Sequence, residues 1–175
     1  MVVGSQGWPR RFLSGLISAN VKPHEHRSEL VGASCLLLAI PVPLPLAYGD
    51  PLTGAWLLSV AVCSLFGDFF YLGTIWNVID RWVAVSFTIY LTCVASQRVP
   101  ALTFANLFLV AGFLAYSQSS CTPEQWRRRH SLWHAVMMCD ITFFLMCIYS
   151  HGESIGGPPV EKNSMQSHHD VAVSI

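Results

Sequence analysis

Charged residues are almost missing from the middle of this chain, and that shortage restricts its fold more than any other feature. Between Ser28 and Trp126 the charged side chains are Glu29, Asp50, Asp68, Asp80, Arg81, Arg98 and Glu124. Charged residues make up 11% of the whole chain, against roughly 25% in an ordinary soluble domain. A water-exposed surface cannot be built from so little charge. The sequence therefore predicts an integral membrane protein.

The overall charge balance narrows the range of partners. The 175 residues contain ten Lys and Arg against ten Asp and Glu, so the formal net charge is zero. A domain that binds nucleic acid presents a clustered basic surface instead. We therefore expect no nucleic-acid partner, and we expect a lipid bilayer as the surroundings of the chain.

Five apolar stretches are long enough, or nearly so, to cross a membrane as helices. A bilayer core needs about 20 mostly apolar residues, with a range of about 17–25. The predicted spans are Leu30–Tyr48, Gly54–Trp76, Trp82–Ala95, Ala101–Ser117 and Ser131–Ser150. Short breaks join them, apart from a polar loop at Gln118–Arg129, and short connections make consecutive spans antiparallel neighbours. We expect an all-α, multi-pass transmembrane helix bundle of about five spans over residues 30–150.

Two of these spans are irregular. The first contains Pro41, Pro43 and Pro45, and proline removes backbone donors that a regular helix interior needs. The helix before Pro41 would be about 17 Å long, so this segment either completes the crossing in extended form or does not cross. The third span, Trp82–Ala95, is short, which suggests packing inside a homo-oligomer.

Positive charges favour one orientation of the bundle. With five spans, one side of the membrane receives Arg10, Arg11, Lys22, Arg27, Arg81, Arg127, Arg128 and Arg129. The other side receives Arg98 and Lys162. This division places the N-terminus in the cytoplasm by the positive-inside rule, whereas four spans would divide the charges too evenly to decide. Residues 1–29 are then a cytoplasmic segment, and the polar residues 151–175 are predicted to be a disordered tail.

Several polar residues lie inside or beside the apolar spans, where an ionisable group costs at least a few kcal/mol. Ser64 and Asp68 are four residues apart and share a helical face, as do His130 and His134. With the N-terminus in the cytoplasm, Asp68 lies about 12 Å inside the cytoplasmic boundary and His134 about 5 Å inside it. Asp80 lies at that boundary. These groups fall in one leaflet, on helices that can adjoin.

Two histidines one helical turn apart form a common metal platform. A zinc site with Asp68 as the third ligand beside His130 and His134 fits this spacing, with Asp80 or Ser64 ordering a water or a ligand. A simpler interpretation stays open, in which both histidines only form hydrogen bonds between helices. The six cysteines include no C-x-x-C pair, so they are predicted to be small buried apolar side chains rather than thiolate ligands.

Three motifs resemble those of one membrane superfamily. The stretch Arg129–His134, with the sequence RHSLWH, resembles the H-S-x-W-H motif that opens the last span in the CREST superfamily. This group contains alkaline ceramidases, adiponectin receptors, GPI-anchor lipid-remodelling proteins and myomaker-like proteins. Its early Ser-x-x-x-His motif corresponds to Ser64–Asp68, and an Asp about a dozen residues later corresponds to Asp80. The chain departs from the pattern where Asp68 replaces the early histidine, and in having fewer than the usual seven spans.

The resemblance implies a zinc-dependent enzyme that hydrolyses an amide or ester bond in a lipid. It implies zinc held by Asp68, His130 and His134, with Ser64 helping to stabilise the oxyanion. Asp80 would orient the water or a ligand, and the lipid substrate would reach the site sideways from the bilayer.

Two other functions remain open on the sequence alone. The protein can be a non-catalytic membrane scaffold or partner-binding protein, since the myomaker-like scaffold need not hydrolyse anything. It can also be a small proton-coupled carrier, because Asp68 and Asp140 fall at about the same depth and paired carboxylates can share a proton. The sequence does not decide whether the protein is an enzyme.

Overall fold

A computed structural model describes residues 13, 16, 17 and 27–150, and every regular element in that part of the chain is a helix. The elements are α2 (Glu29–Leu37), α3 (Pro43–Ala47), α4 (Pro51–Leu65), the π-helix η2 (Phe66–Phe70), α5 (Ile75–Arg98), α6 (Pro100–Gln118) and α7 (Pro123–Ser150). Four of the helical stretches are long and apolar enough to cross a membrane. The all-α, multi-pass prediction is confirmed.

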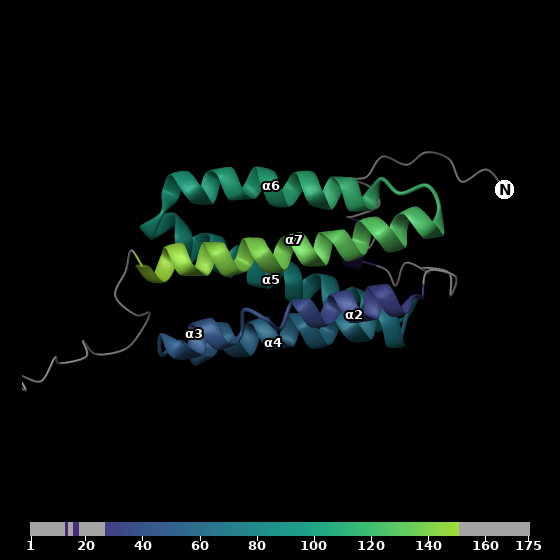
Figure 1. Ribbon diagram of the computed structural model, residues 1–175, viewed down its shortest axis with the longest axis horizontal. Coiled ribbons are helices and arrows are strands. Elements are labelled where there is room, and N and C mark those ends of the chain that lie inside the picture. Colours follow the sequence, from purple (N-terminus) through teal and green to yellow (C-terminus); the bar gives the residue numbers. More distant parts are fainter. Residues whose placement is uncertain (1–12, 14–15, 18–26, 151–175) are drawn as a thin grey trace, which may run out of the picture.

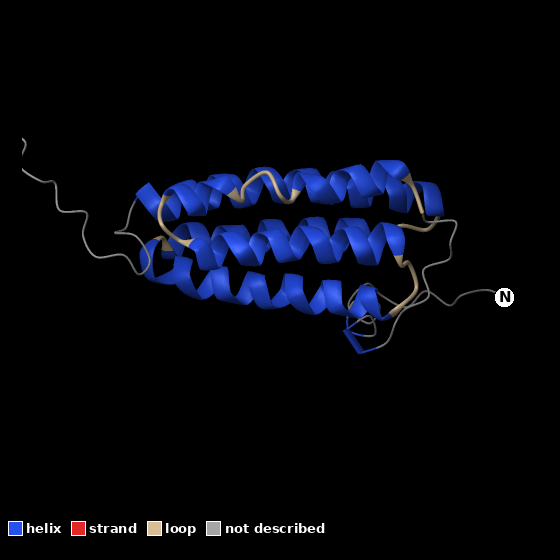
Figure 2. Cartoon of the chain, turned by 90° about the horizontal axis from the view of Figure 1, so that it is seen from below, coloured by secondary structure: helices blue, strands red, loops and turns tan. Residues whose placement is uncertain are grey.

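The helices run side by side along one axis and form a closed ring. α4 packs against α5, α5 against α6 and α6 against α7, and α2 and α3 pack against both α4 and α7. Figure 1 shows α6 at one side, α7 in front of α5, and α2 and α3 end to end along α4. The view turned by 90° shows the same parallel arrangement of long helices (Figure 2). Side chains from all the long helices therefore meet inside the ring.

The first apolar segment is a broken helix, and it completes the ring. α2 and α3 are joined by consecutive i→i+3 turns, such as Ala39 N to Leu36 O and Val42 N to Ala39 O. Pro43 begins α3, where a helix needs no backbone donor. Of the two alternatives left open for this segment, the extended crossing is therefore wrong, and the segment is not among the four helical stretches long and apolar enough to span a membrane. Tight turns satisfy the backbone groups that the prolines would otherwise leave without partners.

Three helix boundaries differ from the predicted spans. The third span is not short, because α5 has 24 residues and begins at Ile75, which removes the reason given for packing inside an oligomer. The second span ends as η2 rather than reaching Trp76. Most of the predicted polar loop at Gln118–Arg129 is helical, because α7 begins at Pro123. Both α5 and α7 begin before their charged residues. The charges therefore indicate where each helix enters the apolar layer, and the helix itself starts earlier in the chain.

The basic residues in the described part of the chain gather at one end of the bundle. Arg27 precedes α2, Arg81 lies in the second turn of α5, and Arg127–Arg129 lie in the second turn of α7, all at the end where α4 finishes. Arg98 lies at the opposite end. The remaining basic residues, most of the predicted N-terminal segment 1–29 and the predicted tail 151–175 lie outside the described residues.

Apolar packing is concentrated between α4, α5 and α7. Leu57, Leu145 and Ile148 are almost fully buried there. The outside of the ring carries large exposed apolar side chains, for example Phe104 and Phe108 on α6. Such a surface suits contact with lipid, in agreement with an integral membrane location.

A polar group closes the end of the bundle where α4 begins. We call it the tyrosine cluster, and it consists of Asp50, Thr53, Tyr90 and Tyr149. Asp50 caps α4 by accepting from Thr53 N at 3.0 Å and from Thr53 Oγ1 at 2.7 Å. Tyr149 OH donates to Asp50 at 2.9 Å, and Tyr90 OH lies 3.1 Å from Thr53 Oγ1. The cluster ties α5 and α7 to the start of α4.

Candidate metal centre

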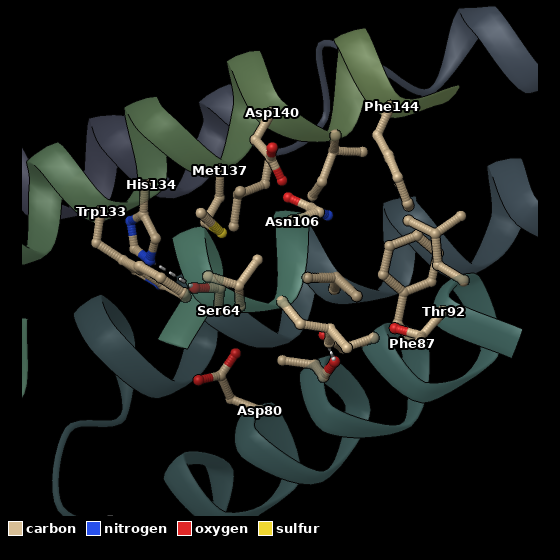
Figure 3. A pocket seen from close by; sticks show the side chains of 18 of the residues that line it. Ser64, Asp80, Phe87, Thr92, Asn106, Trp133, His134, Met137, Asp140 and Phe144 are labelled. Carbon is tan, nitrogen blue, oxygen red and sulfur yellow. Dashed lines mark hydrogen bonds between the residues drawn. The ribbon is translucent and has the colours of Figure 1, made fainter. Parts of the chain in front are cut away.

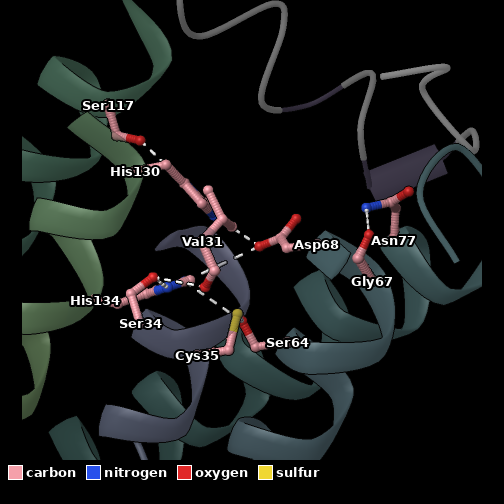
Figure 4. Close-up of polar contacts among 10 residues, drawn as sticks. All are labelled: Val31, Ser34, Cys35, Ser64, Gly67, Asp68, Asn77, Ser117, His130 and His134. Atoms are coloured by element: carbon pink, nitrogen blue, oxygen red, sulfur yellow. Dashed lines mark hydrogen bonds and ion pairs between the residues drawn. The ribbon is translucent and has the colours of Figure 1, made fainter. Parts of the chain in front are cut away.

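A second polar group lies inside the ring at the arginine-rich end. We call it the histidine cluster, and its members are Ser34 and Cys35 of α2, Ser64 of α4, Asp68 of η2, and His130 and His134 of α7 (Figure 4). All six residues are buried. The cluster thus joins α2, the α4–η2 helix and α7.

Asp68 is the centre of this cluster. Its Oδ2 atom lies 2.6 Å from His130 Nε2 and 4.0 Å from His134 Nε2, and the residue is 2% exposed. It lies in the five-residue π-helix Phe66–Phe70, and π-helical turns inside α-helices are frequent at functional sites. The wider turn shifts the register at the end of α4, and Asp68 faces both histidines from there.

Hydrogen bonds assign the tautomer of His134. Ser34 Oγ donates its single proton to Val31 O at 2.7 Å, so it accepts from His134 Nδ1, which lies 2.9 Å away. With the proton on Nδ1, the Nε2 atom of neutral His134 keeps its lone pair. That lone pair is on the side of Ser64 and Asp68, and a metal ion binds this form of imidazole.

His130 is held differently. An ionised carboxylate can only accept, so His130 Nε2 carries the proton shared with Asp68. Its Nδ1 atom lies 3.2 Å from Ser117 Oγ of α6, and its ring stacks on Trp126 with centroids 4.5 Å apart. His130 is thus bonded to Asp68 and lies outside the group of three converging ligand atoms, and its predicted role as a metal ligand stays a prediction.

Three potential ligand atoms converge at the cluster. The Sγ atom of Cys35, a carboxylate oxygen of Asp68 and a ring nitrogen of His134 all lie within 4.8 Å of one another, and all three residues are buried. The structure therefore brings together Asp68 and His134, as predicted, and adds Cys35. No spacing signal marks Cys35 in the sequence, because it belongs to no C-x-x-C pair and lies in an apolar run.

Ser64 and Asp80, the two predicted catalytic residues, lie at different distances from this group. Ser64 Oγ is 3.4 Å from His134 Nε2 and 3.7 Å from Cys35 Sγ. Asp80 lies in α5 and lines the same cavity as Ser64. Its backbone position is fixed by close packing of α5 on η2, where Asn77 donates to Gly67 O at 2.5 Å. Arg81 is near enough to interact electrostatically with both Asp68 and Asp80.

The inside of the ring holds a cavity of about 130 Å³ next to the cluster. Its polar lining residues include Ser64, Asp80, Asn106, His134 and Asp140 (Figure 3). One buried water needs roughly 10–15 Å³ of such cavity volume, so the cavity has room for an ion with several waters or for a small chemical group. It is too small for a whole lipid, whose chains must remain outside.

Asp140 lies on the α7 wall of the cavity and faces Asn106 of α6 (Figure 3). With the Asn106 nitrogen turned toward the carboxylate, it donates to the two oxygens at 3.0 and 2.8 Å. The carrier hypothesis pairs Asp140 with Asp68. In the structure these two carboxylates have different partners, since Asp68 bonds to His130.

Comparison with known proteins found no matching protein-family model, no matching curated protein and no matching solved structure. The class of protein is therefore defined by the fold and the site alone. It is a multi-pass helical membrane protein with a buried Cys, Asp and His group that can hold a metal ion.

Proposed function

We propose that this protein is a membrane-embedded, zinc-dependent hydrolase that cleaves an amide or ester bond in a lipid. The observation that carries the proposal is the convergence of Cys35, Asp68 and His134 within 4.8 Å beside a cavity. The resemblance of the three sequence motifs to the CREST superfamily supports the reaction type. The lipid bilayer supplies the substrate.

The residues present fit a zinc ion. Thiolate, carboxylate and imidazole are all ordinary zinc ligands, and three protein ligands with one open position are typical of a catalytic site. Ser34 keeps the proton of His134 on Nδ1, so Nε2 is ready to bind. His130 forms a hydrogen bond with Asp68. Carboxylates that bind metals are commonly held by such a hydrogen bond from a neighbouring side chain.

In the proposed reaction, side chains around the cavity have separate roles beside that of the zinc ion. Zinc, when bound, lowers the pKa of a water and polarises a substrate carbonyl. Both Ser64 and Asp80 line the cavity; in this proposal Ser64 donates a hydrogen bond to the oxygen of that carbonyl, and Asp80 accepts a proton or orients the water. Apolar side chains around the cavity exclude bulk water, which strengthens these electrostatic interactions.

We further propose that the N-terminus is cytoplasmic, so that the site lies in the cytoplasmic leaflet. The arginines of the described residues at the end of the bundle near the site support this orientation, with only Arg98 at the other end. α7 has 28 residues, about 42 Å of helix, so its first turns reach beyond a hydrocarbon layer of about 30 Å. Arg127–Arg129 then lie among lipid headgroups.

A second function is favoured by the hydrogen bonds themselves. Asp68 is bonded to His130, and His134 to Ser34, so these polar groups have protein partners. The bonds connect α2, η2 and α7, and a non-catalytic scaffold protein would need no more than this. In that case the histidine cluster stabilises the closed ring, and the functional surface lies elsewhere.

Metal content separates the two functions. We would measure zinc by elemental mass spectrometry on protein purified in mild detergent without chelator. The hydrolase requires about one zinc per chain, lost in Cys35→Ala and in His134→Ala but kept in Cys63→Ala, the matched cysteine control on α4. Folded wild-type protein without metal, or full zinc in both cluster variants, would contradict the proposal and favour the scaffold.

Activity is the second stage of the same experiment. Zinc-loaded protein would be screened against lipid amides and esters, with Ser64→Ala as the test variant. The expected result is a turnover that Ser64→Ala reduces while its zinc content stays at the wild-type level. A turnover that is equal in both proteins would remove Ser64 from the reaction.

A further inference from the structure

Asp140 is a carboxylate on the cavity wall without a cationic partner. It lies in the middle of α7, half-buried, and Asn106 donates to both of its oxygens. Among residues 27–150, no Lys, Arg or His is paired with it, and Arg81 interacts with Asp68 and Asp80 instead. Asn106 fixes the direction of the carboxylate but does not neutralise it.

A charge in this position needs compensation. Ionisable groups inside a membrane-spanning helix are costly, and they usually face a cavity and mark a ligand or ion pathway. In the tyrosine cluster, Asp50 accepts from three separate donors, whereas the donor to Asp140 among the described residues is the single amide group of Asn106. Asp140 instead faces the cavity with lone pairs left over.

The other residues that line the cavity indicate what kind of ligand can balance the charge of Asp140. Among the described residues, three carboxylates line the cavity, from Asp68, Asp80 and Asp140, and no Lys or Arg does. The two lining histidines are already bonded, His130 to Asp68 and His134 to Ser34. Asp68 and Asp80 already interact with Arg81, and Asp68 also with His130. Asp140 is therefore the carboxylate whose charge a ligand can balance, and a cation suits it better than a phosphate group.

Two of the residues that line the cavity, Thr88 of α5 and Leu107 of α6, are exposed. An opening between α5 and α6 would admit a headgroup while its hydrocarbon chain stays against the apolar outside. Asp140 is six residues from His134 on α7, which is about 9 Å along the helix axis. A headgroup bound at Asp140 is thus within reach of the histidine cluster.

We propose that Asp140, oriented by Asn106, binds the ammonium group of an amino lipid that enters the cavity between α5 and α6. This deepens the proposed function, on which it rests for the reaction, by naming a positively charged headgroup in the substrate. The binding step itself depends only on the cavity. Asp140 is here a binding residue that sets substrate class and takes no part in bond cleavage.

The test uses three photoactivatable single-chain probes of equal chain length, with an amine, an alcohol or a phosphate headgroup. Full-length protein in lipid nanodiscs would be labelled with each probe, and the labelled peptide identified by mass spectrometry. In the wild type we expect the amine to label at least about tenfold more than the other two, which corresponds to about 1.4 kcal/mol. The label should map to α6 near Asn106 or to α7 near Asp140.

Two variants check the assignment. Asp140→Asn should reduce the amine preference to about twofold or less, since the isosteric amide has no charge to attract a cation. Glu124→Gln removes a carboxylate from the exposed start of the same helix and should leave labelling unchanged. Equal labelling by all three probes, a label mapping to other helices, or an undiminished preference in Asp140→Asn would overturn the proposal. The peptide map from the wild type decides the matter if Asp140→Asn does not fold.

Zinc measured in the same samples keeps the two proposals apart. Zinc present with labelling that does not depend on the headgroup would remove the amino-lipid site and leave the hydrolase standing. Headgroup-dependent labelling without zinc would remove the zinc hydrolase and leave the amino-lipid site standing.

Discussion

The two ends of the bundle each bury an aspartate to the same extent, yet the two residues have different surroundings. Asp50 and Asp68 are both 2% exposed. In the tyrosine cluster, Asp50 accepts from a backbone N–H and two hydroxyl groups, which stay protonated near neutral pH. In the histidine cluster, Asp68 faces two imidazoles and a thiol, all of which can bind a metal.

The difference shows that burial of a carboxylate does not by itself indicate a functional site. A buried polar group is stable when it is fully hydrogen-bonded, and the Asp50 arrangement meets this need with donors that have no other chemistry. The Asp68 arrangement meets it with groups that titrate, ligate metals or attack substrates. The identity of the partners, rather than the depth of the aspartate, therefore distinguishes a helix cap from a candidate metal centre.

The largest expected effect is on metal-dependent stability. A bound ion present at about 1,000 times its Kd would stabilise the fold by about 4 kcal/mol. Adding a chelator should therefore lower the thermal unfolding midpoint of the wild type and of Asp50→Ala. It should leave Asp68→Ala unchanged, because that variant has lost a ligand. An equal response of the two aspartate variants would remove the distinction between the clusters.

Double-mutant cycles give the next largest effect. Hydrogen bonds to charged groups contribute about 1.5–3 kcal/mol, and we expect this coupling between Asp68 and His130 and also between Asp50 and Tyr149. With metal present, the Asp68–His130 coupling should increase, since His130 then also fixes a ligand, whereas the Asp50–Tyr149 coupling should not change. Free energies of unfolding with and without chelator measure both cycles. A metal-dependent change at Asp50 would contradict the assignment of the tyrosine cluster as structural.

Close packing beside Asp68 gives a third prediction. A Cβ atom on Gly67 would lie 3.1 Å from both Asp80 Cβ and Trp76 O, so Gly67→Ala must push α5 away from η2. Overpacking of this kind costs about 1–3 kcal/mol, and zinc binding should weaken with it. Gly112→Ala is the matched control, since a Cβ there meets nothing within 4 Å. Unfolding midpoints that fall equally in both variants would show that the contact with α5 does not support the site.

The smallest expected effect concerns the tautomer of His134. Ser34→Ala removes the acceptor for His134 Nδ1–H, and loss of such a partner lowers metal affinity by about tenfold or more. Ser59→Ala is the control, because Ser59 is exposed and bonds only to Ala55 O in its own helix. Zinc competition titrations with a chromogenic chelator measure both affinities. An unchanged affinity in Ser34→Ala would mean that His134 is oriented without Ser34.

The class of fold and part of the site could be predicted from local properties of the chain. Hydrophobic runs identify the long helices, since lipid requires about 20 apolar residues per crossing. The i, i+4 spacing places His130 and His134 on one face whatever the rest of the chain does. Asp68 was identifiable because a charged residue in an apolar run has few structural roles.

The tertiary structure decided which of these residues meet, and it did so by closing the ring. Ser34 and His134 are 100 positions apart in the chain, and they touch because the broken first segment packs between α4 and α7. That same packing brings Cys35 to Asp68, and the antiparallel pairing of α6 and α7 brings Asn106 to Asp140. Hydrophobicity and helical periodicity are properties of neighbouring residues, so the sequence alone determined the helices and their polar faces. Contacts between distant segments depend on which helix lies beside which, and only the packed bundle fixes that order.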